Sequence, residues 1–396
     1  MYFHPVIKSR EGVNTYVIAA VLIALLLAGR GFLALGDFSY FFVAGSDFVD
    51  PSATPEPVWV QNGQGYDGQF FYRYALDPFN FNKTDFGITV DLVPYRIQRL
   101  MYPLLSWIFS FGGNPALVPY ALILVNILAF FGTLFFTNAF FRSLNVTNTT
   151  ALLPLLLCGI YMSLARDLAE VVELFFFTAS IYFLFRKNYV WFGLLASCTT
   201  LTKETSLITF LPVVLISLYG IFKTSQFTGK TLFLFLPFCI FAAWKLLIAS
   251  QTVTIVGIPG VQIFGIPFMG LAAGFLGNLD ISSTKNQLQL LFWILYIIWQ
   301  IYIVAQVLKT IFYHKPDNSN YFFLALSGSY LCWLLFAILL SPAIYIDDWS
   351  FVRVFSLWNM TGFLLLYLRN RPVPNLFRYY SMLLVGLTLV RLIIRP

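Results

Sequence analysis

The chain has little charge, few cysteines and only two histidines, and each shortage excludes a class of protein. Charged residues make up 10% of the 396 residues and hydrophobic ones 59%, far outside the composition of a soluble globular domain. The four cysteines lie in apolar runs without a CxxC pair, so they provide neither a disulfide framework nor a thiolate metal site. Two histidines cannot build a His-rich metal centre. Soluble enzymes, disulfide-rich secreted proteins and disordered proteins are therefore excluded.

The chain also lacks a basic stripe and an internal repeat. Its net charge of +7 is scattered over short flanks of apolar segments, which excludes a nucleic-acid partner and is explained better by membrane topology. No repeat of 20–50 residues and no inverted halves are visible, and this disfavours a secondary transporter.

Long apolar runs dominate what is present, with a mean hydropathy of +0.79 and an aromatic content of 19%. Runs long enough to span a bilayer alternate with Lys and Arg flanks, which predicts an all-α polytopic membrane protein with its N-terminus in the cytoplasm. We expect one transmembrane domain over 1–396 with about ten or eleven spans. They lie near 14–35, 115–141 and 149–165, then in a span that returns to Arg186 and Lys187, and near 189–222 (an out-and-back pair), 231–249, 288–308, 321–340, 353–368 and 379–393.

Acidic residues gather on one side of this topology. Two long external segments are predicted, 36–112 and 250–287, and 15 of the 17 acids lie in or near external segments, Glu11 and Asp317 being the exceptions. Acids contribute little to membrane orientation, so the topology rule does not require this bias. It indicates a working face.

The first external segment carries Gly-Gln-Gly-Tyr-Asp-Gly-Gln-Phe-Phe-Tyr-Arg over 63–73. Its glycines give Asp67 a tight setting, and the aromatic run 70–74 predicts a short helix at the membrane interface. This arrangement would hold a carboxylate at the bilayer surface. The alternative is that Asp67 only caps this helix.

A second polar element follows Pro94. Arg96, Arg99 and Tyr102 are spaced three apart and share one face of a predicted helix. Two guanidiniums at the outer interface can bind a phosphate or diphosphate, or they can snorkel toward lipid headgroups.

Acids and bases also interrupt the later apolar runs. Arg166, Glu170 and Glu173 open one apolar helix, where ionisable groups are costly unless they face a bundle interior or a wet cavity; an Arg166–Glu170 pair is the structural alternative.

Lys203 and Glu204 interrupt another apolar run at a predicted external turn, either as a helix-end pair or with the lysine on a lipid phosphate. Arg353 begins a span after the Asp347-Asp348 loop and is another candidate phosphate ligand, with headgroup contact as its alternative.

Two of these motifs together resemble a known family. Tyr66-Asp67-Gly68-Gln69-Phe70-Phe71-Tyr72, followed by Arg99-Leu100-Met101-Tyr102-Pro103-Leu104-Leu105, resembles bacterial membrane glycosyltransferases of the GT-C superfamily. The motifs are most similar to those of the mannosyltransferases of GPI-anchor assembly. The resemblance covers about residues 13–105.

The resemblance implies a GT-C-like bundle in the bacterial inner membrane. Such an enzyme transfers mannose or another hexose, with inversion, from a polyprenyl-phosphate donor to a lipid or glycan acceptor on the non-cytoplasmic face. Asp67 would be the general base, with Asp37, just after the first span, as its rival. Arg96, Arg99, Arg353 and Lys203 would bind the donor phosphate. The other expected substrate-binding residues are Tyr66, Gln69, Arg73, Arg166, Glu170, Glu173, Glu204 and Asp348.

The residues agree with this resemblance. A single displacement at the sugar carbon needs a base and phosphate stabilisation but no His, Cys or nucleotide-binding loop, and no such loop is present. We expect no cofactor, although scattered carboxylates leave a divalent cation open. The alternatives are a lipid-linked oligosaccharide polymerase or ligase, and a transporter of a glycolipid or ion.

Overall fold

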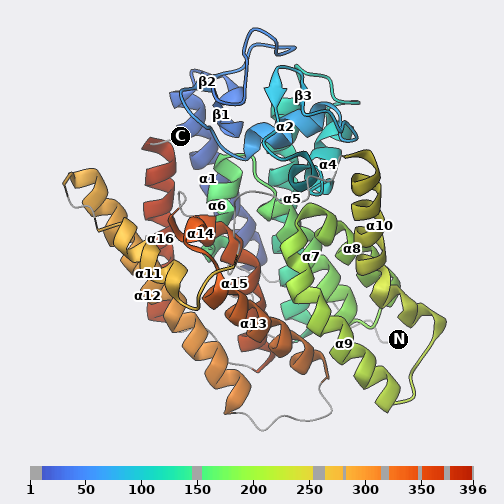
Figure 1. The fold of residues 1–396 in the computed structure, drawn as a ribbon. Coiled ribbons are helices and arrows are strands. Elements are labelled where there is room, and N and C mark those ends of the chain that lie inside the picture. Colours follow the sequence, from blue (N-terminus) through green and yellow to red (C-terminus); the bar gives the residue numbers. More distant parts are fainter. Residues whose placement is uncertain are drawn as a thin grey trace.

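The computed structural model describes residues 11–144, 154–252, 264–279, 282–313, 321–346, 350–369 and 375–394. In these residues the chain is a bundle of helices with one long irregular segment at one end (Figure 1). The α-helices are α1 (Glu11–Leu33), α2 (Gly68–Leu76), α3 (Val93–Arg96), α4 (Met101–Phe109), α5 (Val118–Ser143), α6 (Cys158–Ala165), α7 (Glu170–Phe185), α8 (Tyr189–Thr202), α9 (Leu207–Lys223), α10 (Leu236–Gln251), α11 (Met269–Gly277), α12 (Thr284–Phe312), α13 (Tyr321–Leu339), α14 (Pro342–Ile346), α15 (Ser350–Leu368) and α16 (Asn375–Ile394). The 3-10 helices are η1 (Phe38–Phe42), η3 (Glu204–Ser206) and η4 (Gly229–Phe235), and the strands are β1 (Ala44–Gly45), β2 (Val60–Gln61), β3 (Thr84–Asp85) and β4 (Ile88–Thr89).

Eight helical segments in the described ranges are long and apolar enough to cross a membrane. They are α1, α5, η3 with α9, η4 with α10, α12, α13, α15 and α16. The all-α membrane fold predicted from the sequence is confirmed, but ten or eleven such spans were expected. The difference lies in α7 and α8, whose 16 and 14 residues fall short of the roughly 20 that a perpendicular span needs. The predicted span 149–165 lies partly outside the described residues and otherwise forms the eight-residue α6.

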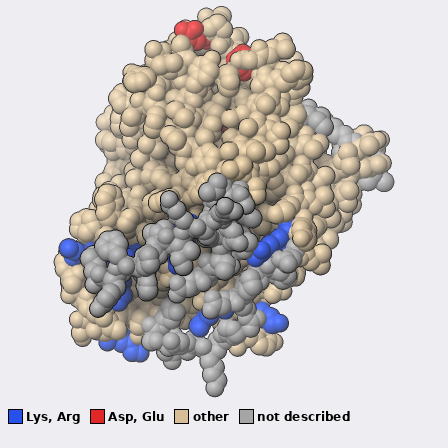
Figure 2. Space-filling model, turned by 180° about the vertical axis from the view of Figure 1, so that it is seen from behind, with Lys and Arg blue, Asp and Glu red and all other residues tan. Residues whose placement is uncertain are grey.

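The exposed charges differ between the two ends of the bundle. We call the end with residues 34–117 the loop end; Asp and Glu lie there on the face shown in Figure 2, and Lys and Arg lie toward the opposite end. We call this opposite end the basic end. Helices α5, α9 and α12 finish there, and their last turns carry Arg142, Lys223 and Lys309. The predicted concentration of acids on one face is therefore present in the fold.

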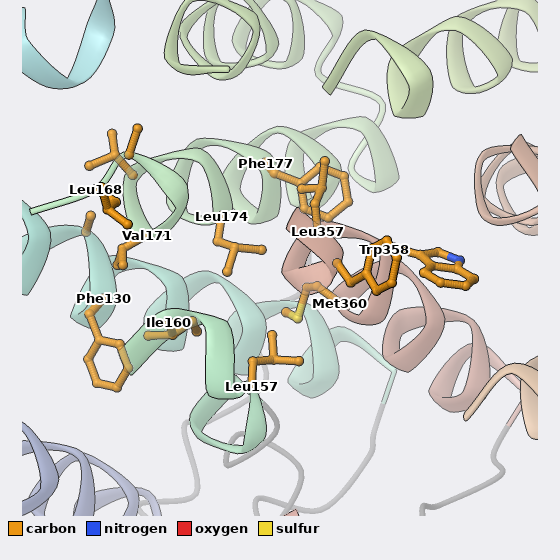
Figure 3. Packing of buried hydrophobic residues seen from close by; sticks show 14 of the residues in the cluster. Phe130, Leu157, Ile160, Leu168, Val171, Leu174, Phe177, Leu357, Trp358 and Met360 are labelled. Carbon is orange, nitrogen blue, oxygen red and sulfur yellow. The ribbon is translucent and has the colours of Figure 1, made fainter. Parts of the chain in front are cut away.

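The core lies where α5, α6, α7 and α15 meet, with Phe130, Ile160, Leu174 and Met360 buried among them (Figure 3). Helix α15 is enclosed by protein over 89% of its apolar window, more than any other candidate span in the described chain. A span surrounded by helices rather than lipid can carry polar side chains, because neighbouring helices provide partners for them. This position explains how α15 holds an arginine.

The segment predicted to be the first external one folds as a compact layer over the loop end. Strands β1 and β2 pair in parallel, β3 and β4 form a hairpin, and α2 lies beneath them. The predicted helix at 70–74 is present as α2, but all nine of its residues are buried, so it does not lie on the surface. The reason is aromatic packing on several sides: Tyr72 stacks on Phe42 at 4.4 Å between ring centroids, and Phe71 meets Tyr102 at 5.2 Å.

The helix predicted after Pro94 is divided into α3 and α4. Helix α3 ends at Arg96, and α4 begins at Met101. Pro103 explains the break, because it has no N–H to bond the carbonyl of Arg99 and its ring disfavours a helical turn there. Arg96, Arg99 and Tyr102 therefore do not share one helical face.

The second predicted external segment, 250–287, is described only in part. Its described portion includes α11, which packs on α14, and Phe264 forms an isolated antiparallel bridge with Leu340.

Candidate functional site

Six side chains of alternating charge form a continuous series at the loop end, which we call the ion-pair chain. Its order is Asp91, Arg96, Asp67, Arg353, Glu170 and Lys203. Three members come from the segment 34–117 of the loop end, one from the start of α7, one from the end of α8 and one from the start of α15. Residues up to 286 positions apart in the sequence thus meet at one point.

Asp67 is the central carboxylate of the chain. Its Oδ1 accepts a hydrogen bond from Arg96 Nη1 at 2.7 Å, and its Oδ2 accepts one from Arg353 Nη2 at 3.1 Å. Asp67 stands at the N-cap of α2, yet its side chain makes no capping hydrogen bond. The capping alternative considered for Asp67 is therefore wrong for its side chain, which is committed to two arginines.

The backbone around Asp67 is built by glycines. Gly63 and Gly65 have positive φ values of 95° and 65°, as the tight setting predicted. A Cβ on Gly68 would collide with the carbonyl oxygens of Arg166 and Phe42. Glycine at this position lets the start of α2 lie directly on the turn between α6 and α7, which brings Asp67 close to Glu170.

Arg96 is held from the side opposite to Asp67. Its Nε and Nη2 donate to the two oxygens of Asp91 at 2.8 and 2.6 Å, a bidentate pair. Its guanidinium also lies 4.3 Å from the ring centroid of Phe70. These contacts fix the plane of the guanidinium and point Nη1 at Asp67.

Arg353 joins Asp67 to the buried half of the chain. Its Nη1 donates to Glu170 Oε1 at 3.1 Å, and Lys203 Nζ donates to the same oxygen at 2.7 Å. The second oxygen of Glu170 accepts a hydrogen bond from Ser163 Oγ at 3.0 Å. Only 3% of the Glu170 side chain is exposed. A buried carboxylate needs partners for its charge, and Glu170 has two cations and a hydroxyl.

Close helix packing determines where Arg353 lies. A Cβ on Gly159 of α6 would meet Arg353 Cα at 2.6 Å and the Val352 carbonyl oxygen at 2.6 Å. Only glycine lets α6 and α15 approach this closely, so the position of Arg353 depends on a residue in another helix.

Arg99 and Glu204 form a separate, bidentate pair beside the ion-pair chain. Arg99 Nε and Nη2 donate to Glu204 at 3.0 and 2.8 Å, and Nη2 also donates to Tyr95 Oη at 2.7 Å. Lys203 and Glu204 lie at a helix end, as suggested: Lys203 is the C-cap of α8, and Glu204 begins η3. They take different partners, since Lys203 binds Glu170 and Glu204 binds Arg99. The suggested Arg166–Glu170 pair differs from the structure, since Arg166 ends α6 and Asp167, at φ 48°, separates it from α7.

Two further residues predicted for the site face the chain. The ring of Tyr66 lies between two guanidiniums, with its centroid 4.4 Å from that of Arg166 and 5.0 Å from that of Arg353. Glu173 is buried one turn beyond Glu170, and its Oε1 has no hydrogen-bond partner in the described part of the chain.

Other predicted site residues lie apart from the chain or outside the described residues. Asp37 is exposed and caps η1 by accepting from Ser39 N at 2.9 Å. Gln69 holds the backbone, accepting from Gly45 N and donating to the Gln64 carbonyl. Arg73 is buried beside Asp85 at 3.8 Å. Asp348 lies outside the described residues.

One member of the ion-pair chain was missed from the sequence. Asp91 was one of many acids in a long loop, and only its place five residues before Arg96 hinted at the pair. Asp167, between Arg166 and the start of α7, is completely buried, and its oxygens have no hydrogen-bond partner among the described residues.

The charges around Asp67 control its protonation. Burial alone would raise its pKa, but the positive charges of Arg96, Arg353 and Arg99 outweigh burial and hold the pKa of Asp67 well below its usual range. Asp67 also raises the pKa of Arg96 against the opposing effect of burial. The site therefore holds an ionised carboxylate whose two oxygens are both engaged.

Among the described residues, no three His, Cys, Asp or Glu side chains gather in the manner of a metal site. Comparisons of the chain with protein-family models, curated proteins and solved structures found no match. Fold and site thus define the class directly: the chain is an all-α, multi-pass membrane protein with a network of ion pairs at one end of its bundle.

Proposed function

We propose that the protein is a membrane glycosyltransferase that uses a polyprenyl-phosphate sugar as donor. The observation that carries this proposal is the ion-pair chain, which places a carboxylate between two guanidiniums at one end of a multi-pass bundle. A carboxylate can take the proton of an acceptor hydroxyl, and guanidiniums can stabilise the phosphate that leaves the sugar. Both groups needed for a single displacement are therefore adjacent.

The placement of charge supports the same proposal. On the face shown in Figure 2, the exposed Lys and Arg lie toward the end opposite the site, and the excess of Lys and Arg on cytoplasmic flanks would make the loop end external. We infer a bacterial inner-membrane protein whose active face is periplasmic. A lipid-linked donor suits this site, because its phosphate can lie at the bilayer surface while its chain remains in lipid.

The residues take the following roles in this proposal. Asp67 is the general base, and Arg96 and Arg353 bind the donor phosphate. Lys203 and Glu170 hold Arg353 in place, and Arg99 is a positioning residue, because Glu204 and Tyr95 occupy its guanidinium. Asp37 becomes the weaker candidate for the base, since it is exposed and its carboxylate caps η1.

The test is sugar transfer by purified protein. Wild type, Asp67→Asn and Asp37→Asn are incubated with radiolabelled polyprenyl-phosphate hexoses and membrane acceptors, with and without a chelator. We expect transfer by the wild type and by Asp37→Asn, and none by Asp67→Asn. Loss of transfer in Asp37→Asn alone would assign the general base to Asp37, the N-cap of η1. A folded wild type that transfers no sugar but moves a glycolipid or ion across vesicles would make the protein a transporter.

A further inference from the structure

Arg96 and Arg353 each have one anchored side and one side turned to Asp67. Arg96 uses Nε and Nη2 for Asp91 and leaves Nη1 for Asp67. Arg353 uses Nη1 for Glu170 and Nη2 for Asp67. If Asp67 moved away, both guanidiniums would keep their orientation, because neither depends on Asp67 alone.

Asp67 is the exchangeable member of the chain. Its side chain is 20% exposed, against 3% for Glu170, so solvent and a ligand reach Asp67 first. Its carboxylate caps no helix, so a rotation costs α2 no hydrogen bond. Among the described residues, movement of the Asp67 side chain therefore breaks only the two hydrogen bonds that an incoming anion would replace.

The two groups released by Asp67 match a phosphate. Arg96 Nη1 and Arg353 Nη2 bond the two oxygens of a single carboxylate, and two oxygens of a phosphate present a similar acceptor pair to guanidinium groups. A phosphate is also an anion, so when it replaces the carboxylate neither guanidinium is left without an anionic partner.

We propose that the Asp67 carboxylate occupies the phosphate site of the empty protein, and that a phosphate ester displaces it when it binds between Arg96 and Arg353. This inference rests on the proposed function for the identity of the ester, a polyprenyl-phosphate sugar. The exchange itself requires only a phosphate group.

The exchange orders the reaction. While Arg96 and Arg353 hold both oxygens, Asp67 is a poor proton acceptor; once the donor phosphate takes these cations, the carboxylate is freed beside the bound sugar. Asp67 then takes the proton of the acceptor hydroxyl as the acceptor oxygen bonds to the sugar carbon. The bond from that carbon to the phosphate oxygen breaks, and its electron pair stays on the phosphate held by the two arginines. Donor binding thus precedes activation of the acceptor.

Phosphate binding tests the exchange without sugar transfer. The probes are farnesyl phosphate, a short polyprenyl monophosphate, and inorganic phosphate, titrated into wild type, Asp67→Asn and Asp91→Asn in detergent. Asp91 is the matched control, because it pairs with the same Arg96 but on the anchored side. Asp67→Asn leaves both arginines with a carboxylate partner, so we expect it to fold. Asp67→Ser is the second variant, and thermal unfolding checks all of them.

We expect both probes to bind Asp67→Asn and Asp67→Ser about tenfold more tightly than wild type, equal to about 1.4 kcal/mol. For Asp91→Asn we expect the affinity for the probes to rise by less than about threefold, because removing a partly exposed charge has a small effect. Equal gains in affinity in the Asp67 and Asp91 variants would show that only net charge matters, and this result would overturn the exchange. No gain in affinity in the Asp67 variants would overturn it as well. Tighter binding of farnesyl phosphate alone would assign the gain to the lipid chain and would also overturn it.

These outcomes separate this inference from the proposed function. The expected binding pattern in a protein that transfers no sugar would support the phosphate site and refute the transferase. Sugar transfer that depends on Asp67, together with unchanged binding by the Asp67 variants, would support the transferase and refute the exchange.

Discussion

Arg353 connects the exposed and buried halves of the ion-pair chain, so replacing it has consequences that can be graded. Arg353→Lys keeps the charge but loses the fork that reaches Asp67 and Glu170 together. Each charge-assisted hydrogen bond contributes roughly 1.5–3 kcal/mol, so the lysine variant, which keeps one, should lose about that much stability. Arg353→Met loses both bonds. In this variant Asp67 still pairs with Arg96, and Glu170 still pairs with Lys203. The methionine variant should therefore lose about 3–5 kcal/mol of stability, the cost of breaking a buried ion pair.

The assay is unfolding in mixed micelles, followed by helical circular dichroism as the fraction of denaturing detergent rises. Lys309→Met is the matched control, because Lys309 is an exposed cation near the basic end of α12, and its loss should change stability by less than about 0.5 kcal/mol. The expected order of stability is wild type, Arg353→Lys, Arg353→Met. A methionine variant as stable as the lysine variant would refute the reasoning, because the bridge would then contribute nothing beyond packing.

Three further predictions follow from the same contacts. Gly159→Ala should separate α6 from α15, lowering both the melting temperature and sugar transfer, whereas Gly386→Ala, with open space at its Cβ, should do neither. A double-mutant cycle of Arg99→Met and Glu204→Leu, measured by unfolding, tests their ion pair. The double variant should lose less stability than the sum of the losses in the two single variants, because each single variant leaves one charge without its partner and the double variant leaves none. The lowered pKa of Asp67 means that its ion pairs stabilise the fold above its ordinary pKa and lose this effect as pH falls below it; melting temperatures should therefore fall less between pH 6 and about pH 3 in Asp67→Asn than in wild type.

The sequence predicted the fold and most of the residues that meet at the loop end. Long apolar runs with basic flanks indicated the membrane helices, because a bilayer core accepts little else. Glu170 was singled out because a charge in an apolar helix is costly unless it has a partner, and Lys203 and Arg353 because each was a candidate ligand of a phosphate at the membrane surface. The structure brings all three together with Asp67.

The pairing of these charges could not be predicted from local spacing. Spacing favoured Arg166 with Glu170, which assumes one continuous helix, and it placed Lys203 and Glu204 at a helix end without indicating a partner for either. The left-handed backbone at Asp167 ends one such helix, and Pro103 breaks another. Which cation meets which carboxylate is decided by close contacts between distant segments.

Glycines that permit these contacts carried no readable signal. Gly159 is one small residue in an apolar helix, and its importance follows only from the presence of Arg353 of α15 against it. Gly68 was noted for turn geometry, whereas its larger effect is to let α2 lie against the carbonyl of Arg166. The sequence shows small residues but not the segments that approach them.

The central claim is that Asp67 is the base of a sugar transfer at this site. The most direct test is a single-turnover measurement of label transferred from a polyprenyl-phosphate hexose to acceptor lipid, by equal amounts of folded wild type and Asp67→Asn saturated with donor. We predict transfer by the wild type and a rate at least about 100-fold lower in the variant, the usual contribution of a general base. Equal rates in the two proteins would contradict the assignment of Asp67.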